Sequence, residues 1–529
     1  MKTSDYPSRS QRLLARGGCW CYRHAAAWTL LFVCVIVAIA AYRLRDAFMD
    51  DAFIGFRYVD NLINRSGLVF NPGEHVEGIT NVGWILLLAA FSKWFAPTTI
   101  AKILGVIFVL VSSLSVYSMA KRASSPDLLR ITCFGAVGVA VTKIDFLFFS
   151  LVGMETALLS TLLCVLVLIS WNHPCHWAIP CLCVLSFLLH PECVIIYPLF
   201  IVLSVLLQRS VWRIAVAPTL MFLTLVAAIT AARLSYYGLP LPNTFYAKAT
   251  ALGNVARQFI AWLQADNTNI PYPFGGALAL ALICIGIYSV HQSQRYAAAM
   301  CVSVLGTGFA FCVYSQPDWT GLGRYFAPYI PLASVALTLG IAHTCRVVSH
   351  AAVRGLAVVP IAAVWVGILI CGQLGHTGKY LFGSRLEGWP GFIMTARTLV
   401  PASKRIGDLL PHDSVIATRR IGAISYYSKL RVFDFAYGLT DRKVAKLIEC
   451  DGRIISSPRS PVISERWREV APTHILDDMS KIETYMKDGG GTLDRFEVHG
   501  MYYGEVDRFP ITGDNNWVLC ERLVPLIKK

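Results

Sequence analysis

Two adjacent carboxylates, Asp50 and Asp51, follow closely on an apolar segment near the start of the chain. Like charges repel at this distance, so one of the two has a raised pKa or the pair recruits a cation, such as a divalent metal ion. A carboxylate just outside a membrane span can also take the proton of an attacking hydroxyl group and so act as a general base. The alternative is a solvated helix start, because Asp is favoured in the first turn of a helix.

The other carboxylates in this part of the chain are scarce and unevenly placed. Residues 1–373 contain only thirteen Asp and Glu residues, and eleven of them fall on one side of the membrane in the topology assigned below. They are Asp46, Asp50, Asp51, Asp60, Glu74, Glu77, Asp145, Glu155, Glu192, Asp266 and Asp318. Acidic residues beside a bilayer are costly and usually functional. We therefore expect a reaction or binding site where these eleven gather.

The composition indicates which elements must position these residues. The 529 residues include 55% hydrophobic and 15% charged side chains, whereas soluble proteins average about 25% charged. Residues 1–373 carry 37 charged side chains, and the much shorter region 374–529 carries 42. These values exclude a soluble or disordered protein. They predict a large membrane domain followed by one compact water-facing domain.

Eleven segments are apolar and long enough for membrane-spanning helices, which need about 20 residues, or fewer where neighbours shield their ends. They cover residues 25–42, 100–120, 128–149, 154–171, 177–190, 193–208, 214–234, 275–291, 296–315, 328–345 and 355–373. The first is too long for a cleaved signal peptide, and no small-residue cleavage site follows it. The sequence thus predicts a polytopic α-helical membrane protein.

A twelfth apolar segment, residues 83–96, decides the topology, because every later segment inverts if it crosses the bilayer. Its length of about 14 residues and its tryptophans, Trp84 and Trp94, favour a helix that lies in the membrane interface. The basic loops around Arg209 and Arg346 then fall on the cytoplasmic side with the N-terminus.

Three regions follow from this topology. Residues 1–24 form a basic cytoplasmic N-terminus, and residues 25–373 form the membrane domain, with a first outer loop at 43–99. Residues 374–529 form a periplasmic or otherwise extracytoplasmic domain. In this domain, β-rich runs and helical patterns predict a mixed α/β fold. The runs lie at 414–417, 430–433 and 517–520, and the helical patterns at 394–410 and 441–450.

Other classes of partner and cofactor are not expected. The net charge of +15 requires no nucleic acid, because Lys and Arg flank the apolar segments as in other membrane proteins. The absence of a Rossmann fingerprint or P-loop argues against direct use of a nucleotide sugar or ATP. Most of the sixteen Cys lie in apolar segments, and no complete zinc motif is present. A disulfide between Cys450 and Cys520, on the oxidising outer side, is left open.

Five blocks of residues together resemble one family. The first covers residues 50–84 (DDAFIGFRYVDNLINRSGLVFNPGEHVEGITNVGW). The others lie within 153–158, 236–248, 323–328 and 422–441. In combination they are similar to the membrane arabinofuranosyltransferase family, typified by the mycobacterial terminal β-(1→2)-arabinofuranosyltransferase. That family belongs to the GT-C superfamily of polytopic glycosyltransferases.

The resemblance implies a GT-C fold with about eleven transmembrane helices and an extracytoplasmic domain. It also implies transfer of a sugar, arabinofuranose in the family, from a polyprenyl-phosphate donor to a cell-envelope glycan, lipid or protein acceptor. The active site would face outward from the cytoplasmic (inner) membrane. A first-loop aspartate would be the general base, and we assign this role to Asp51 with Asp50 in support; the reverse assignment stays open. Direct displacement of the phosphate inverts the anomeric carbon.

Transfer from a phosphate also needs groups that hold the departing phosphate. We expect Lys248 and Arg324 to bind it, with Asn243 and Tyr246 as neutral hydrogen-bond donors. The alternative for the two cations is an anchoring role at the membrane interface.

The remaining substrate-binding candidates are Arg57, Tyr58, Glu77, Glu155, Glu192 and Asp318. Asp318 stands next to Trp319, and carbohydrate rings pack on aromatic faces. Glu155 lies at a helix end, where it can bind sugar hydroxyls or simply cap the helix. Glu77 flanks a turn, so a structural role is an alternative for it as well.

Two positions depart from the family pattern. Relatives often have Arg-Pro-Glu-Gly where this chain has His-Pro-Glu-Cys at residues 190–193, and an acidic residue where it has Arg419 and Arg420. These changes bear on the sugar and the acceptor more than on the reaction class. The rival function is a transporter or flippase of lipid-linked sugars. Such proteins typically show internal repeats and charged residues in mid-membrane, which are not evident here.

Overall fold

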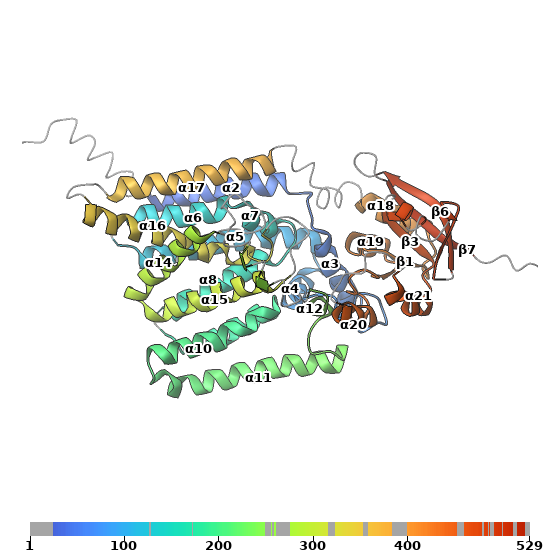
Figure 1. Cartoon of the computed structure of the whole chain (residues 1–529), viewed down its shortest axis with the longest axis horizontal. Coiled ribbons are helices and arrows are strands. Elements are labelled where there is room, and N and C mark those ends of the chain that lie inside the picture. The colour runs from blue at the N-terminus through green and yellow to red at the C-terminus, as the bar shows by residue number, and fades with distance from the viewer. Residues whose placement is uncertain are drawn as a thin grey trace, which may run out of the picture.

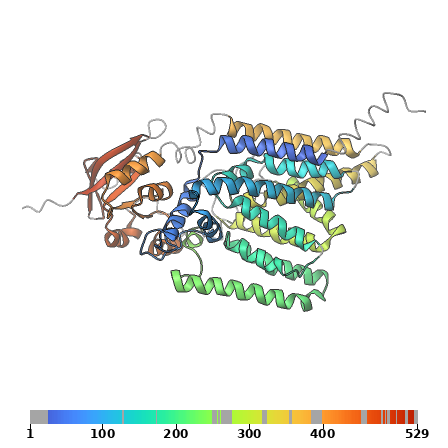
Figure 2. The same ribbon diagram turned by 180° about the vertical axis from the view of Figure 1, so that it is seen from behind.

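The protein consists of a helical bundle joined to a domain with a β-sheet, as seen in the computed structural model (Figures 1 and 2). It describes residues 25–125, 128–171, 173–248, 255–256, 259–260, 276–315, 323–352, 358–382, 399–451, 460–478, 481–484, 486, 491–499, 501–510 and 516–523. The N-terminal region 1–24, expected to be cytoplasmic, lies outside these residues.

Each of the eleven predicted apolar segments contains helix. The bundle helices are α2 (Ala25–Arg43), α5 (Pro97–Ala123), α6 (Leu129–Thr142), α7 (Ile144–Leu151), α8 (Thr156–Ser170), α9 (Ala178–Phe187), α10 (Ile196–Leu207), α11 (Val211–Tyr237), α14 (Ala277–Ser293), α15 (Arg295–Tyr314), α16 (Ile330–Ala352) and α17 (Val358–Leu381). Short 3₁₀ turns, η1 (Pro191–Ile195) and η2 (Ala327–Tyr329), precede α10 and α16. Among the described residues, six helices are long and apolar enough to cross a membrane. The polytopic helical architecture is confirmed, and the number of eleven spans stays a prediction.

The segment predicted as one span over residues 128–149 is broken in two. α6 and α7 meet at an angle of 59°. The break is at Lys143, whose backbone is extended (φ −76°, ψ 115°) rather than helical. α7 therefore starts a new helix with Asp145 in its first turn.

The first outer loop folds into two helices at the end of the bundle that faces the sheet domain. These are α3 (Asp50–Ile63) and α4 (Val82–Phe91), which lie next to the short α12 (Asn243–Lys248) in Figure 1. With ten residues, α4 is about 15 Å long and too short to cross a bilayer. Trp84 is buried and Trp94 is 70% exposed, in keeping with the expected interfacial helix.

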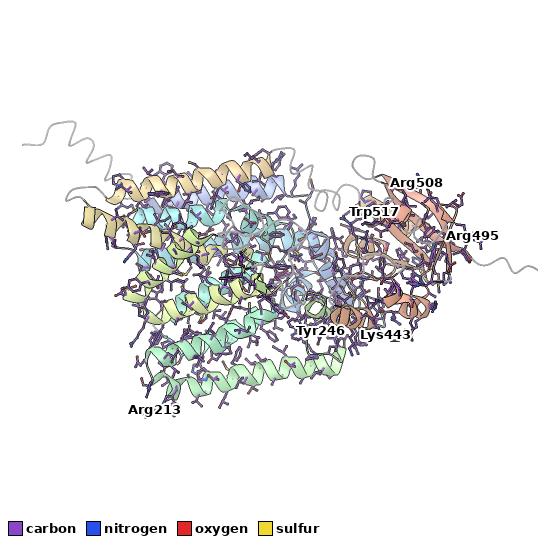
Figure 3. The ribbon with its side chains drawn as sticks, viewed as in Figure 1. Arg213, Tyr246, Lys443, Arg495, Arg508 and Trp517 are labelled. Atoms are coloured by element: carbon purple, nitrogen blue, oxygen red, sulfur yellow. The ribbon has the colours of Figure 1, made fainter. Side chains whose placement is uncertain are left out.

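Basic residues gather at the opposite end of the bundle. Arg213, in the first turn of α11, lies far from the sheet domain in Figure 3. Gln208 joins the neighbouring loop there, because its Oε1 accepts a bond of 2.6 Å from Nη2 of Arg295. Nη2 of Arg346 donates to the hydroxyl of Ser125 at 2.5 Å. The two ends of the bundle thus differ strongly in charge.

The C-terminal domain is a mixed sheet with helices, as predicted. Its strands are β1 (Val415–Ala417), β2 (Arg431–Phe433), β3 (His474–Asp478), β4 (Gly491–Thr492), β5 (Arg495–Val498), β6 (Met501–Pro510) and β7 (Asn516–Leu523). Its helices are α18 (Val400–Leu409), α19 (Gly422–Ser428), α20 (Arg442–Asp451) and α21 (Ser464–Val470), with the 3₁₀ turn η4 (Pro461–Ile463). The strand order is β2-β1-β3-β7-β6-β5-β4. β1 is parallel to β2 and β3, and the other pairs are antiparallel.

The first outer loop covers the edge of this sheet at β2. Nδ2 of Asn71 donates to the carbonyl oxygen of Val432 at 3.0 Å, and Oδ1 of Asn71 accepts a bond from the N–H of Val432 at 3.2 Å. One side chain thus replaces a neighbouring strand and protects an edge that would otherwise be open. Cys520 is a buried free thiol in β7, so it does not form the disulfide left open above; the side chain of Cys450 lies outside the described residues.

Candidate active site

α3 begins at the two adjacent carboxylates, and the C-terminal domain covers the first of them. The oxygens of Asp50 accept N–H bonds from Gly422 (3.1 Å) and Ala423 (2.9 Å) at the start of α19. Only glycine allows this approach, because a Cβ at residue 422 would lie 1.9 Å from the Asp50 carbonyl oxygen. Asp50 is 7% exposed, and its burial raises its pKa. Asp50 therefore joins the two domains.

Asp51 is the accessible member of the pair. Its side chain is 32% exposed, and its Oδ2 accepts a bond of 2.6 Å from Nη1 of Arg324. Arg324 follows Gly323, whose N–H donates to Oδ1 of the buried Asp145 at 2.8 Å. The structure thus joins Asp51 to a cation 273 positions away in the sequence, and Asp145 holds the turn that carries this cation.

The carboxylates of this pair do not form the oxygen-rich site that a divalent cation requires. Both oxygens of Asp50 are bonded to backbone N–H groups, and Asp51 is bonded to a guanidinium. Within the described part of the chain, no three His, Cys, Asp or Glu side chains form a metal-binding group. The residues present at Asp50 and Asp51 therefore do not fit the metal ion considered from the sequence.

Arg57 and Tyr58, on the next turns of α3, hold the first outer loop in place. Arg57 is 3% exposed, and its guanidinium donates to the carbonyl oxygens of Phe70 (3.2 Å) and Lys429 (3.1 Å). The fully buried hydroxyl of Tyr58 accepts the N–H of Gly78 at 2.8 Å. Their polar groups are engaged in fixing the loop between the bundle and the sheet domain.

Glu155 and Glu192 meet around a histidine. Nε2 of His190 lies 3.1 Å from Glu155, and Nδ1 lies 2.8 Å from Glu192. The amide of Asn81 donates to the other oxygen of Glu155 at 2.6 Å. Because only an imidazolium carries a proton on both nitrogens, this arrangement suits a charged ring. The two predicted glutamates thus form one buried network.

The structure links the network to α3 through Gly153. A Cβ at residue 153 would lie 3.1 Å from the Cβ of Ala52, and its φ of +93° also favours glycine. The carbonyl oxygen of Gly153 accepts the indole N–H of Trp84 at 3.1 Å. The block at residues 153–158 therefore seats both α3 and α4 on the bundle.

Glu77 forms a second buried ion pair. Its Oε1 lies 3.2 Å from Nε of Arg233 on α11, and the two side chains are 2% and 5% exposed. Burial raises the pKa of Glu77 to about 7, although the nearby arginine opposes this rise. The carbonyl oxygen of Glu77 accepts the N–H of Asn243 at 2.9 Å, and the amide of Asn243 donates to Gly438 at 2.9 Å. Asn243 thus connects the loop to the sheet domain.

The other phosphate and sugar candidates are only partly described. Tyr246 is half-buried on α12, between the bundle and the sheet domain in Figure 3. The side chain of Lys248 and the whole of Asp318 lie outside the described residues.

Three residues at the site were missed as candidates: Asn81, Asp145 and Arg233. For two of them a signal exists in the sequence. Asp145 and Arg233 are charges within apolar segments, which is a costly placement that usually indicates a function. Asn81 stands in a polar loop, and only its contact with Glu155 sets it apart.

Comparisons with known proteins extend these observations. A domain of unknown function (DUF8728) matches residues 394–519. The terminal beta-(1->2)-arabinofuranosyltransferase of Mycobacterium tuberculosis is 26% identical over 255 residues. This match covers 44% of the chain and 39% of the mycobacterial protein, so the chain spans less than half of that relative's length.

Similar solved structures cover more of the chain. ArnT from Cupriavidus metallidurans, bound to undecaprenyl phosphate, has a TM-score of 0.52 at 12% identity and covers 93% of this chain and 98% of its own. Its apo form has a TM-score of 0.54 at 14% identity, with 94% and 98% covered. The Archaeoglobus fulgidus oligosaccharyltransferase has a TM-score of 0.51 at 11% identity, with 85% and 69% covered. The chain therefore has the fold of these membrane proteins, and the expected GT-C architecture is confirmed.

Proposed function

We propose that this protein is a membrane glycosyltransferase that moves a sugar from a polyprenyl-phosphate donor to a glycan, lipid or protein acceptor. The accessible Asp51, held by Arg324 where the bundle meets the sheet domain, carries the proposal. The shared fold supports a lipid-linked donor, because ArnT binds undecaprenyl phosphate. The name of the mycobacterial relative supports arabinofuranose as the sugar.

The pair supplies the two groups that the reaction needs. Asp51 accepts the proton of the acceptor hydroxyl while the acceptor oxygen forms its bond to the anomeric carbon. The bond between this carbon and the phosphate oxygen breaks, and polyprenyl phosphate leaves with the electron pair. The guanidinium of Arg324 stabilises the charge that develops on the phosphate. Attack opposite the leaving group inverts the anomeric carbon.

The other residues fall into two groups around this pair. In this proposal Glu155 and Glu192 bind sugar hydroxyls, and His190 is the cation between them. Asn243, Tyr246, Lys248 and Asp318 complete the substrate site. Asp50, Arg57, Tyr58 and Glu77 hold the first loop and so position the base.

We place this site on the extracytoplasmic face of the cytoplasmic membrane. The end of the bundle that carries Arg213 is opposite to the end that faces the sheet domain (Figure 3), and Asp50, next to Asp51, is bonded to that domain. Positive residues favour the cytoplasmic side, so the carboxylates and the sheet domain face outward.

The test is sugar transfer by purified protein in nanodiscs, supplied with polyprenyl-phosphate arabinofuranose and a glycan acceptor. We expect Asp51→Asn to lower kcat by roughly 10²–10⁴, the usual contribution of a general base. Asp60→Asn is the matched control, because Asp60 stands on the same helix and its carboxylate pairs with the exposed Lys429. This control is expected to retain transfer.

Unchanged transfer by the Asp51→Asn variant would remove this residue from the role of base. The protein can also be reconstituted into closed lipid vesicles. Movement of the lipid-linked sugar across the vesicle membrane without sugar transfer would instead indicate a flippase.

A further inference from the structure

The C-terminal domain presents the carboxyl ends of its parallel strands toward the first outer loop. β1 and β2 are parallel, and β1 and β3 are parallel, so the carboxyl ends of all three strands line the same edge of the sheet. In sheets of this kind, ligands bind beyond the carboxyl ends of the strands. Asp50 is bonded to Gly422 and Ala423, which open α19 in the segment that follows β1. This edge therefore lies against the start of α3, where Asp51 stands.

One cation at this edge, Arg420, forms no ion pair within 4 Å in the described part of the chain, although its charge acts on the buried Asp50 and lowers the pKa of that carboxyl. Arg420 is half-buried, three residues after the end of β1. Its guanidinium lies over the ring of Trp517, 5.7 Å from the centroid. Trp517 pairs with Asp478 at the carboxyl end of β3. Stacking on an aromatic ring fixes the plane of the guanidinium and leaves its N–H groups free to bind a phosphate or carboxylate in a bidentate manner.

The neighbouring Arg419 differs in this respect. Its Nε and Nη2 donate to the two oxygens of Asp477 at 3.1 and 2.8 Å. This bidentate pair neutralises Arg419 within the sheet and ties β1 to β3. The tandem arginines thus have different tasks, one structural and one open to a ligand.

Tyr437 connects the edge with the base. Burial is the main cause of the raised pKa of Tyr437, and the charge of Asp51 raises it further while that of Arg420 lowers it. The phenol is therefore within electrostatic reach of both side chains. It is half-buried in the loop that follows β2.

We propose that this edge binds the acceptor, and that Arg420 selects a carbohydrate that carries a phosphate or carboxylate group. The proposal rests on the function above, because it assigns the second substrate of the same site. The donor phosphate is attached to a chain in the bilayer, so it reaches Asp51 from the bundle, where Arg324 lies. Arg420 follows β1 in the sheet domain, which lies outside the bundle (Figure 1), and its side chain is half-buried rather than enclosed.

The test measures binding rather than transfer, with the full chain in detergent. Glucose 6-phosphate, glucuronate and uncharged glucose are the water-soluble probes, and undecaprenyl phosphate is the lipid probe. We expect glucose 6-phosphate and glucuronate to bind more tightly than glucose. Arg420→Gln should weaken the binding of both anions roughly tenfold, because a charge-assisted bond is lost, and leave undecaprenyl phosphate within twofold. Arg420→Lys should be intermediate, since it keeps the charge without the planar fork.

Arg495→Gln is the matched control. The guanidinium of Arg495 also lies over a ring, 4.1 Å from the centroid of Tyr502. It stands at the far end of the sheet domain in Figure 3, whereas Trp517 is on the side nearer the bundle. This variant should bind all four probes like the wild type, and its melting temperature sets the scale for purely structural effects.

Two outcomes would overturn the proposal. In one, the wild type does not distinguish the anionic sugars from glucose. In the other, Arg420→Gln weakens the binding of undecaprenyl phosphate instead, which would assign the edge to the donor. Failure of every form, wild type included, to bind undecaprenyl phosphate counts against the proposed function and is a separate result.

Discussion

Asp50 and Asp51 are neighbours of one residue type, yet the fold gives them opposite environments. Successive residues on a helix point about 100° apart, so the two carboxylates leave α3 in different directions. Asp50 faces the backbone N–H groups of α19 and is buried, whereas Asp51 faces Arg324 and stays partly open to water. A substrate hydroxyl can reach only the second without separating the domains. This difference supports Asp51 as the base.

The pH dependence of stability should report on Glu77. Burial raises the pKa of Glu77 from an ordinary value of 4.5 to about 7. The folded protein then holds the proton more tightly than the unfolded chain. The contribution of this group is fully present below pH 4.5 and is lost as the pH rises to about 7. We expect the Tm of the wild type, relative to Glu77→Gln, to fall over this interval in thermal unfolding experiments.

Glu74→Gln serves as the control for this measurement. Glu74 pairs with Arg431, but both side chains are partly exposed, and such pairs contribute about 0–1 kcal/mol. The Tm of the Glu74→Gln variant should change with pH in the same way as the Tm of the wild type. If the Tm of the wild type and that of Glu77→Gln changed in parallel with pH, burial would not raise the pKa of the Glu77 carboxyl.

Among the elements, the contact of α3 with α19 decides the position of Asp51, the proposed base. It joins the first turn of a helix from the first outer loop to a short helix of the sheet domain. Phe53 on α3 packs against Tyr426 and Tyr427 on α19, with ring centroids 5.7 and 5.4 Å apart. Gly422 brings the two backbones together.

Gly422→Ala should separate these two helices. The new Cβ would lie 1.9 Å from the Asp50 carbonyl oxygen and 2.7 Å from the Asp50 carbonyl carbon. Neither backbone atom can move without shifting a helix, so we expect a loss of at least about 1–3 kcal/mol in stability and a marked loss of sugar transfer. A lower Tm together with reduced kcat would be the measured result.

Gly306→Ala on α15 is the comparison, because nothing lies within 4 Å of its Cβ position. There the change should be neutral or stabilising by up to about 1 kcal/mol, as expected for alanine in a helix. Equal melting temperatures for the two alanine variants would contradict a close contact at Gly422.

Across the whole molecule, charge is separated along the bundle. Asp50, next to Asp51, is bonded to the sheet domain, and Glu77 is connected to it through Asn243. Arg213 lies at the other end of the bundle (Figure 3). In a membrane this separation orients the protein, because basic loops stay in the cytoplasm. In the proposed orientation, Asp51 faces acceptors outside the cytoplasmic membrane.

Fusions to alkaline phosphatase, which is active only outside the cytoplasm, can check this orientation. A fusion at the C-terminus should give high phosphatase activity, and one at Gln294, between α14 and α15, should give little. Green fluorescent protein at the same two positions should show the opposite pattern. Phosphatase activity of the Gln294 fusion alone would show that the topology is the reverse of the one proposed, with the site on the cytoplasmic side.

The sequence by itself determined the kinds of element and their approximate limits. The apolar run at 100–120 became α5, and the β-rich run at 517–520 became part of β7. The free energy of burying an apolar segment in lipid depends mainly on its own residues, so a local pattern suffices to identify it. The grouping of acids at one end followed from the same reasoning. The bend at Lys143 could not be predicted in this way, because no proline or glycine stands there to indicate it.

Only the tertiary structure decided which charges meet. Asp51 is bonded to Arg324, Asp50 to Gly422, and Glu77 to Arg233, across 273, 372 and 156 positions of sequence. No local pattern encodes such pairs, because their energy depends on the distance between groups that the packing of the whole bundle brings together. For the same reason the division of roles between the two aspartates, open in the sequence, depends on the C-terminal domain that covers one of them.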